Sequence, residues 1–443
     1  EKAKQKSAYL FKDENGNELP GLNGEQYMDY MEKKLRAACR SAENIAPPAD
    51  LLQTIKYVID PGPEDKDEKG KPFTTLLFSQ TTSAQQLIIS LKILSNYDYL
   101  ENLYFSQFQF TQAALEEVFS FVKKSQVKSL SFIAPNFSTQ QIKQLFQFVG
   151  GTKLQKICIR ECPIQADALL AAGLQIEKNF LQIQADCEET IRLAIQKHNL
   201  DLEEARNRPK DKKKSKPGKK SKKLEIWQLQ PEDLIAERFT LNEIKLEYCF
   251  IDEQSASPLG IFFSKVASII QKVSLKGNQF GCKGLEQIGV GLQKAFQKIE
   301  FIKYEEDPLL KETYSGSRIL QLEELNLENC KVDFDAEAFQ QFGLGISKCG
   351  NLKTINLDQN LFKQMKTLLF WFEKQWSLVN VKVSNLLDET EVQQLVEAMK
   401  THDKKQIQVD KQIKKLAKLA KKKKKEVVEE TKPEDAQQEG QGK

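Results

Sequence analysis

Cysteine and histidine are the residue types that most often carry metal or nucleophile chemistry, and both are present. The chain has eight cysteines and two histidines, and the most closely spaced cysteines are Cys158 and Cys162. A zinc site needs paired ligands at short spacing, and neither His198 nor His402 stands at such a spacing from a cysteine. The sequence therefore predicts no metal site. Cysteines without a paired pattern favour a reduced, intracellular compartment.

A cluster of glycines is the second feature whose spacing could do chemistry, since glycine-rich loops cradle phosphates. The cluster comprises Gly277, Gly281, Gly284, Gly289 and Gly291. Their spacing matches neither GxGxxG nor GxxxxGK[ST]. No phosphate loop and no cofactor is predicted from these residues.

Catalysis needs a nucleophile beside a base, or paired carboxyl groups in an apolar pocket. The two histidines are far apart in the sequence, so a Ser-His-Asp or Cys-His set is not expected. Acidic pairs such as Glu323–Glu324 fall on expected surfaces rather than in pockets. The sequence predicts no catalytic residues and no enzyme.

Two lysine-rich segments are the features that point most strongly towards a partner. The net charge of +4 is the balance of +8 in residues 209–223, +10 in residues 404–425 and −14 in the remainder. Such segments either solubilise the chain or attract a polyanion, such as acidic protein tails, RNA or a membrane surface. Few aromatic residues interleave the lysines, so any nucleic-acid contact would ignore base sequence and weaken steeply with salt.

The candidate polyanion-binding residues are Lys212, Lys213, Lys214, Lys219, Lys220, Lys222, Lys223, Lys414, Lys415, Lys418, Lys421 and Lys422.

Length and hydropathy limit how such residues can be arranged. A chain of 443 residues exceeds one ordinary compact core, so several domains or one repeat array are expected. No apolar run reaches the length of a membrane span, and the polar first residues lack the apolar core of a secretory signal. The chain begins at Glu1 without an initiating Met, so residue 1 need not be its natural start.

An internal repeat organises most of the chain. The segments starting at Leu322 and Leu352 both read LxxLxLxx(N/C)xφ, where φ is apolar, and the same frame fits at Leu154, Leu241 and Ile270. Weaker copies start at Phe73, Leu100, Val127, Phe296 and Leu378. Ten candidate copies at intervals of about 26–30 residues predict a solenoid in which each repeat buries its apolar face against its neighbours.

Each position in the frame has a physical reason. Alternate residues of a strand point to opposite faces, so Leu325 and Leu327 should face inward while Glu324, Asn326 and Glu328 face outward. The Asn or Cys position turns the chain, with its side chain inside to bond backbone groups. Helical apolar spacing fills the rest of each repeat, as in residues 111–122.

These repeats resemble the leucine-rich repeats of the ribonuclease-inhibitor-like kind, over residues 73–177 and 239–400. The resemblance implies an α/β fold: a right-handed horseshoe with a parallel sheet on its concave face and helices on its convex face. Members of the family hold proteins with the concave sheet or the rim. The scaffold is shared by many functions, so the resemblance fixes none of them.

The expected organisation follows from where the pattern starts and breaks. A cap with a helix at about 24–42 precedes the repeats, a projecting helix and a Lys-rich disordered stretch interrupt them, and a loop replaces one helix near 303–321. The segments are 1–72, the cap; 73–177, the first array; 178–238, the insertion; 239–402, the second array; and 403–443, a basic helix and acidic disordered tail.

The first hypothesis is a non-enzymatic protein–protein interaction scaffold or a subunit of a larger intracellular assembly, with a cytoskeletal or ciliary complex as one setting. The alternative is an RNA- or ribosome-associated protein that holds the polyanion with its lysines. Candidate protein-contact residues are Tyr104, Ser106 and Arg160 in the first array, and Lys245, Glu247, Ser274, Lys276, Asn326, Glu328, Asn356 and Asp358 in the second.

Overall fold

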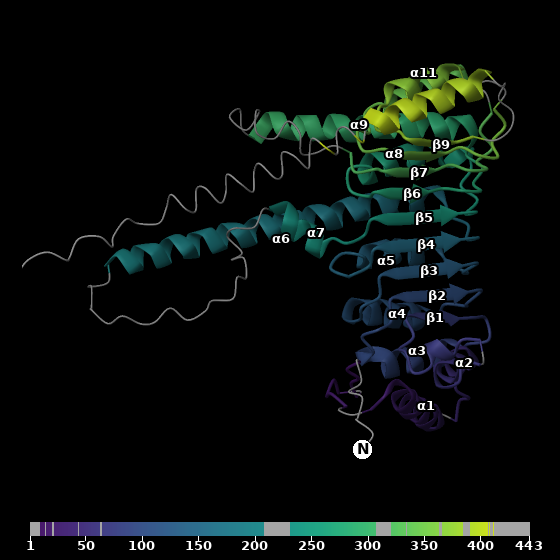
Figure 1. Ribbon diagram of the computed structural model, residues 1–443, viewed down its shortest axis with the longest axis vertical. Helices are drawn as coiled ribbons and strands as arrows, with labels where there is room; N and C mark the ends of the chain where they lie inside the picture. The colour runs from purple at the N-terminus through teal and green to yellow at the C-terminus, as the bar shows by residue number, and fades with distance from the viewer. Residues whose placement is uncertain are drawn as a thin grey trace, which may run out of the picture.

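Nine parallel strands form one sheet, and they follow one another across it in chain order (Figure 1). The computed structural model describes residues 9–13, 15–19, 22–42, 44–62, 64–207, 231–306, 320–333, 335–362, 366–383, 390–405, 407 and 411. The strands are β1 (Thr75–Phe78), β2 (Asn102–Ser106), β3 (Ser129–Ile133), β4 (Lys156–Arg160), β5 (Glu243–Glu247), β6 (Lys272–Ser274), β7 (Glu324–Asn326), β8 (Thr354–Asn356) and β9 (Asn380–Lys382).

Helices connect the strands and cover one face of the sheet, so the chain is a leucine-rich-repeat solenoid, as the repeat frame predicts. The cap contains α1 (Gly24–Ser41) and α2 (Ala49–Ile59). The repeats contain α3 (Ala84–Ile93), α4 (Gln112–Lys124), α5 (Thr139–Phe148), α6 (Ala166–Asn207), α7 (Pro231–Arg238), α8 (Ala256–Val266), α9 (Gly281–Glu306), α10 (Ala336–Ile346) and α11 (Lys366–Lys374). The concave face is here the sheet face turned away from the helices.

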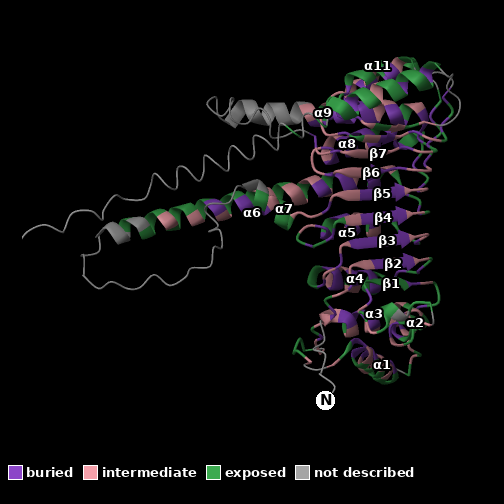
Figure 2. Ribbon diagram, viewed as in Figure 1, coloured by how far each residue is buried: buried purple, intermediate pink, exposed green. Residues whose placement is uncertain are grey.

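The core lies between the sheet and the helices (Figure 2). Alternation along each strand produces it: Leu103 and Phe105 of β2 are buried, while the residues between and beside them are half-buried. Pairing in register aligns these positions from strand to strand, so that Phe105 stacks on Phe78 and on Phe132, with ring centroids 5.8 and 5.4 Å apart. The aromatic rings therefore form a continuous row inside the first repeats.

Polar residues at the start of the helices fix where each helix begins. Ser83, Thr111 and Ser138 each accept a hydrogen bond from a backbone N–H in the first turn of α3, α4 and α5. These N–H groups have no partner within the helix, and a capping side chain supplies one. The strand-to-helix turn is thus specified in the sequence by a hydroxyl at the same place in successive repeats.

The two arrays form one continuous sheet, because β4 pairs directly with β5 in parallel register. The break in the repeat pattern predicted an insertion that begins at residue 178, but no structural boundary lies there. Instead α6 is a single helix of 42 residues, which starts in the helix layer of the fourth repeat and runs on away from the array (Figure 1). Residues 208–230, with their lysines, lie outside the described part.

The copy predicted at Phe296 is wrong. Of the loop expected near 303–321, residues 303–306 belong to α9, and most of the rest lies outside the described residues. Phe296 lies inside α9, which extends to Glu306, and β6 pairs directly with β7. One repeat is therefore longer than its neighbours and takes up the extra residues partly as helix. The remaining residues of that connection, 307–319, are not among those described.

A buried histidine packs against the last repeat, at the C-terminal end of the array. His402 lies in a helical stretch at 390–405, and its ring nitrogens are 2.8 Å from the Leu378 carbonyl oxygen and 3.0 Å from the Glu373 carbonyl oxygen. The side chain is buried. Both nitrogens therefore contribute to the packing of the last repeat.

Candidate functional site

The concave face presents three rows of side chains, and the predicted contact residues all belong to two of them. Strand register places Tyr104 beside Ser131, Cys158 and Lys245 in the middle row. Ser106, Arg160 and Glu247 occupy the row at the carboxyl ends of the strands. Ser274, Asn326 and Asn356 continue the middle row, and Lys276, Glu328 and Asp358 follow the ends of β6, β7 and β8.

The concave face divides into two chemically different parts. Strands β1 to β3 offer hydroxyl, amide and apolar side chains there, including Leu77, which is 46% exposed, and Tyr104. Within these described strands the face carries no charged side chain. From β4 to β7 basic residues and glutamates alternate across the strands. A partner would therefore meet an uncharged surface beside a charged one.

The charged part is arranged as pairs across neighbouring strands. Lys272 Nζ lies 2.6 Å from Glu324, and Lys276 Nζ lies 2.7 Å from Glu328. Hydrogen bonds to these carboxylates raise the pKa of both lysines. The Lys272–Glu324 pair is exposed, and an exposed pair stabilises a fold by at most about 1 kcal/mol. Both pairs do fix their side chains, so a ligand there would have to displace a partner already in place.

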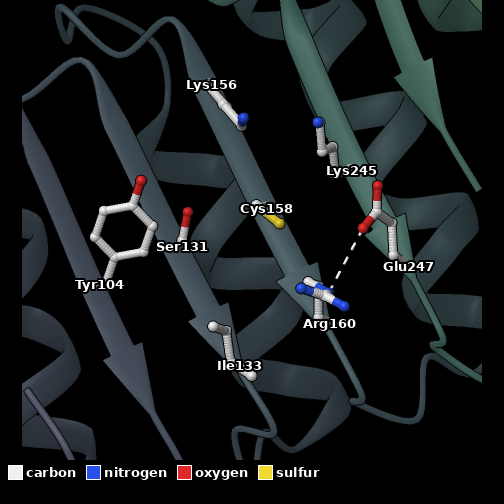
Figure 3. Close-up of a pocket in the computed structure, with 8 residues that line it drawn as sticks. All are labelled: Tyr104, Ser131, Ile133, Lys156, Cys158, Arg160, Lys245 and Glu247. Atoms are coloured by element: carbon white, nitrogen blue, oxygen red, sulfur yellow. Dashed lines mark ion pairs between the residues drawn. The ribbon is translucent and has the colours of Figure 1, made fainter. Parts of the chain in front are cut away.

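A shallow hollow of about 190 Å³ lies where the two parts meet, between β2 and β5 (Figure 3). Cys158 lies at its centre, and burial, followed by the nearby Glu247 carboxylate, raises the pKa of this thiol to about 11. A thiol with such a pKa carries almost no thiolate at neutral pH and is a poor nucleophile. The hollow is thus suited to binding and not to thiol chemistry. Its lining residues are Tyr104, Ser131, Ile133, Lys156, Cys158, Arg160, Lys245 and Glu247.

Three cations and two carboxylates surround this hollow. Lys156 and Lys245 share Glu243, at 3.6 and 3.0 Å. Burial lowers the pKa of Lys245, but the hydrogen bond and charge of Glu243 outweigh it, so the pKa is raised. Arg160 faces Glu247, with Nε 3.6 Å from Oε2, as Figure 3 shows. That separation exceeds a hydrogen bond, and Nε, which is covered, has no hydrogen-bond partner.

Two aromatic residues that the sequence reasoning missed follow β5, at the edge of the concave face. Tyr248 lies under Arg160, whose guanidinium carbon is 5.7 Å from the ring centroid. Phe250 follows two residues later and is 59% exposed. Both have positive φ, at 55°. A signal was available, because Phe250 is the aromatic residue at a frame position where Gln279, Lys331 and Leu361 stand in other repeats of the second array.

The left-handed conformation at the Tyr248 position is part of the repeat. Equivalent residues after the strands also have positive φ, namely Gln107, Ala134, Glu161, Gly277, Asn329 and Gln359. At Gly277, φ is 74° and a Cβ would overlap the Tyr248 ring. Glycine is therefore required there, because the ring of the preceding repeat occupies the space of a side chain. This explains one of the glycines that had been weighed as a phosphate loop.

The turn cysteines and the paired glutamates have structural partners. Cys249 and Cys330 are buried at the turn position and donate through Sγ to the Ile159 and Leu275 carbonyl oxygens, at 3.3 and 3.2 Å. Glu323 and Glu324 pair with Lys353 and Lys272. The candidate polyanion-binding lysines all lie outside the described residues. Among the residues that the structure describes, no group of three or more potential ligands could hold a metal ion.

No helix in the described ranges combines the length and the apolar character needed to cross a membrane.

Comparison with known proteins identifies no family. No family model matches the chain, and no curated protein matches it. A crystal structure of the Rad7–Elc1 complex from yeast is similar at 12% identity and a TM-score of 0.25, over 82% of this chain and 91% of that one. A crystal structure of a TLR13–ssRNA13 complex is similar at 11% identity and a TM-score of 0.23, over 66% of this chain and 40% of that one. Such low scores carry no functional argument.

Proposed function

We propose that the chain is a non-enzymatic protein–protein interaction scaffold, or a structural subunit of a larger intracellular assembly, and that it binds a partner on its concave face. The observation that carries the proposal is the uncharged surface of β1 to β3, where Leu77 is exposed and the half-buried Tyr104 lines the hollow. Exposed apolar and aromatic side chains on a rigid sheet suit contact with another protein.

Further features support the proposed subfamily, compartment and type of assembly. The repeats, with full helices between the strands, suit the ribonuclease-inhibitor-like subfamily. All eight cysteines are free and seven are buried, which suits a reduced compartment. The assembly we propose is of cytoskeletal or ciliary type, in which a long array can hold neighbouring subunits. Enzymatic activity is not part of the proposal, because His402 is committed to packing and the Cys158 thiol is unreactive.

Affinity capture from cells of the source organism, with mass spectrometry, tests the proposal. The chain provides a matched pair of variants: Leu77→Glu on the concave face and Leu174→Glu on α6 in the helix layer, where both leucines are 46% exposed. We expect a stable set of proteins that survives moderate salt and nuclease, is retained by Leu174→Glu and is lost with Leu77→Glu.

Two other outcomes would contradict the proposal. Retention of the same proteins by both variants would exclude the concave face as the binding surface. Loss of all partners after nuclease treatment, or after deletion of 209–223 and 404–425, would favour polyanion binding through the lysines, with its steep dependence on salt.

A further inference from the structure

We infer that the rim formed by the ends of β4 and β5 recognises an extended, acidic segment of a partner protein, in which Arg160 binds a carboxylate and Phe250 packs against a neighbouring apolar side chain. This inference rests on the proposed function and names the chemistry of the partner. It goes beyond that function, because the uncharged surface alone would accept many partners.

Arg160 differs from the paired lysines Lys272 and Lys276 because its Nε has no hydrogen-bond partner. Lys272 and Lys276 are each hydrogen-bonded to a carboxylate. Arg160 Nε stands 3.6 Å from Glu247 Oε2, too far for a hydrogen bond, and has no hydrogen-bond partner. Its side chain is 40% exposed at the mouth of the hollow. A planar guanidinium in this position can bind a carboxylate through two parallel N–H donors.

The charge around Arg160 favours one carboxylate over a polyanion. Glu247 is only 13% exposed, and it already accepts a hydrogen bond from Ser274 Oγ at 2.7 Å. With Lys156, Arg160 and Lys245 against two carboxylates, the hollow has a net charge of +1. A single acidic side chain would neutralise it.

Phe250 departs from the usual preferences of phenylalanine in both its backbone conformation and its exposure, which indicates a role in binding rather than in folding. A bulky residue avoids positive φ, and a large apolar side chain gains nothing from facing water. Lys331 occupies the equivalent position with φ 56° and is polar, so the fold itself does not need an aromatic residue there. Residues that violate local preferences without a structural gain are concentrated at functional sites.

The backbone holds Phe250 in place before any partner binds. Asn278 Oδ1 accepts hydrogen bonds from the N–H groups of Cys249 and Ile251, at 3.0 and 3.1 Å, on either side of Phe250. Asn278 is fully buried. A side chain presented on such a fixed loop loses little freedom on binding. Arginine and aromatic residues together are also the usual centres of protein interfaces.

Selection from a displayed library of random linear peptides on the purified full chain tests the inference. We expect the enriched peptides to share an Asp or Glu close to an apolar residue. Arg160→Gln and Phe250→Asn should each weaken the best enriched peptide, made synthetically, by about tenfold or more. Phe250→Asn should leave the melting temperature unchanged or higher, because Asn tolerates positive φ, so that lost binding is not lost folding.

Two controls make the test specific. Leu361→Asn removes an apolar residue at the same frame position, with 55% of it exposed, three strands further along the sheet, and should bind the peptide like the wild type. Arg160→Glu should shift the selection towards basic peptides. No enrichment, an enriched motif without acidic residues, or equal effects of Leu361→Asn and Phe250→Asn would overturn the inference. If captured proteins depend on Leu77 but not on Arg160 or Phe250, the proposed function stands and this inference is wrong.

Discussion

Asn278 lies beneath the backbone of Cys249, and its Oδ1 accepts a hydrogen bond from the Cys249 N–H at 3.0 Å. The same relationship recurs one pair of repeats later, where Asn360 Oδ1 accepts from the Cys330 N–H at 2.9 Å. Each asparagine also donates through Nδ2 to the carbonyl oxygens of its own and the preceding repeat. A buried amide thus joins two neighbouring turns and satisfies backbone groups that have no water available.

Replacing Asn278 with Ala should therefore destabilise the array strongly. The change leaves several buried backbone groups unpaired, so we expect the unfolding free energy to fall by about 3 kcal/mol or more. Asn278→Cys should cost less, because cysteine occupies this position in the repeats of Cys249 and Cys330. Denaturant titration measures both. Asn356→Ala on the concave face is the control, and an equal loss there would contradict the role assigned to Asn278.

Gly289 permits α9 and α10 to approach closely, and this predicts whether Gly289→Ala raises or lowers the stability of the fold. A Cβ on Gly289 would overlap the Gln341 carbonyl, and a Cβ on Gly345 would lie 2.5 Å from the Gly289 carbonyl oxygen. In an exposed helix Gly→Ala stabilises by about 1 kcal/mol, whereas overpacking costs about 1–3 kcal/mol. We expect overpacking to win, so that Gly289→Ala lowers the melting temperature. Glu286→Ala on the same helix should leave it nearly unchanged, and a stabilised Gly289→Ala would refute the close approach.

The frame predicted the strands well because its inward residues make the core. Leu325 and Leu327 are buried, as alternation requires. The copy at Phe296 failed because apolar residues three apart suit a helix as well as a degenerate strand, and only pairing of β6 with β7 decides between them. The aromatic residue at the Phe250 frame position could be read from the sequence, but its backbone conformation could not. Positive φ at Tyr248 and Phe250 contradicts the preferences of those residues and becomes visible only in the folded chain.

The long helix α6 and the short helix α7 share a small core that is separate from that of the array. Cys187 and Ile191 of α6 pack with Leu234 of α7. Because this cluster is separate, Leu234→Ala should release α7 and speed proteolysis near it, while the melting temperature of the array stays within about 1 °C. Leu259→Ala in α8, which belongs to the main core, should lower that temperature by several degrees. Equal melting temperatures for these two variants would show that α6 and α7 unfold together with the array.

The buried thiols predict that the fold becomes less stable towards alkaline pH. Burial raises the pKa of Cys158 and Cys162 to about 11 and that of Cys330 to about 12, from an ordinary value of 9.0. Above about pH 9 the unfolded chain therefore releases thiol protons that the folded chain retains, and the unfolding free energy falls as pH rises. At about pH 10 the loss is about 1 kcal/mol for each such thiol. Denaturant titrations between about pH 8 and 10 measure it.

Cys158→Ser measures how much one thiol contributes to the fall of the unfolding free energy at alkaline pH. Serine suits the site, because Cys158 pairs in register with Ser131 on β3 and both face the hollow. A serine hydroxyl does not titrate in this range, so the variant should lose about 1 kcal/mol less than the wild type between about pH 8 and 10. The pKa of Lys245, raised by Glu243, acts in the same direction, since the folded chain also retains that proton longer. Its contribution begins above about pH 10 and remains in the variant. Identical pH dependence in the two proteins would mean that the Cys158 thiol ionises as readily in the folded chain as in the unfolded one.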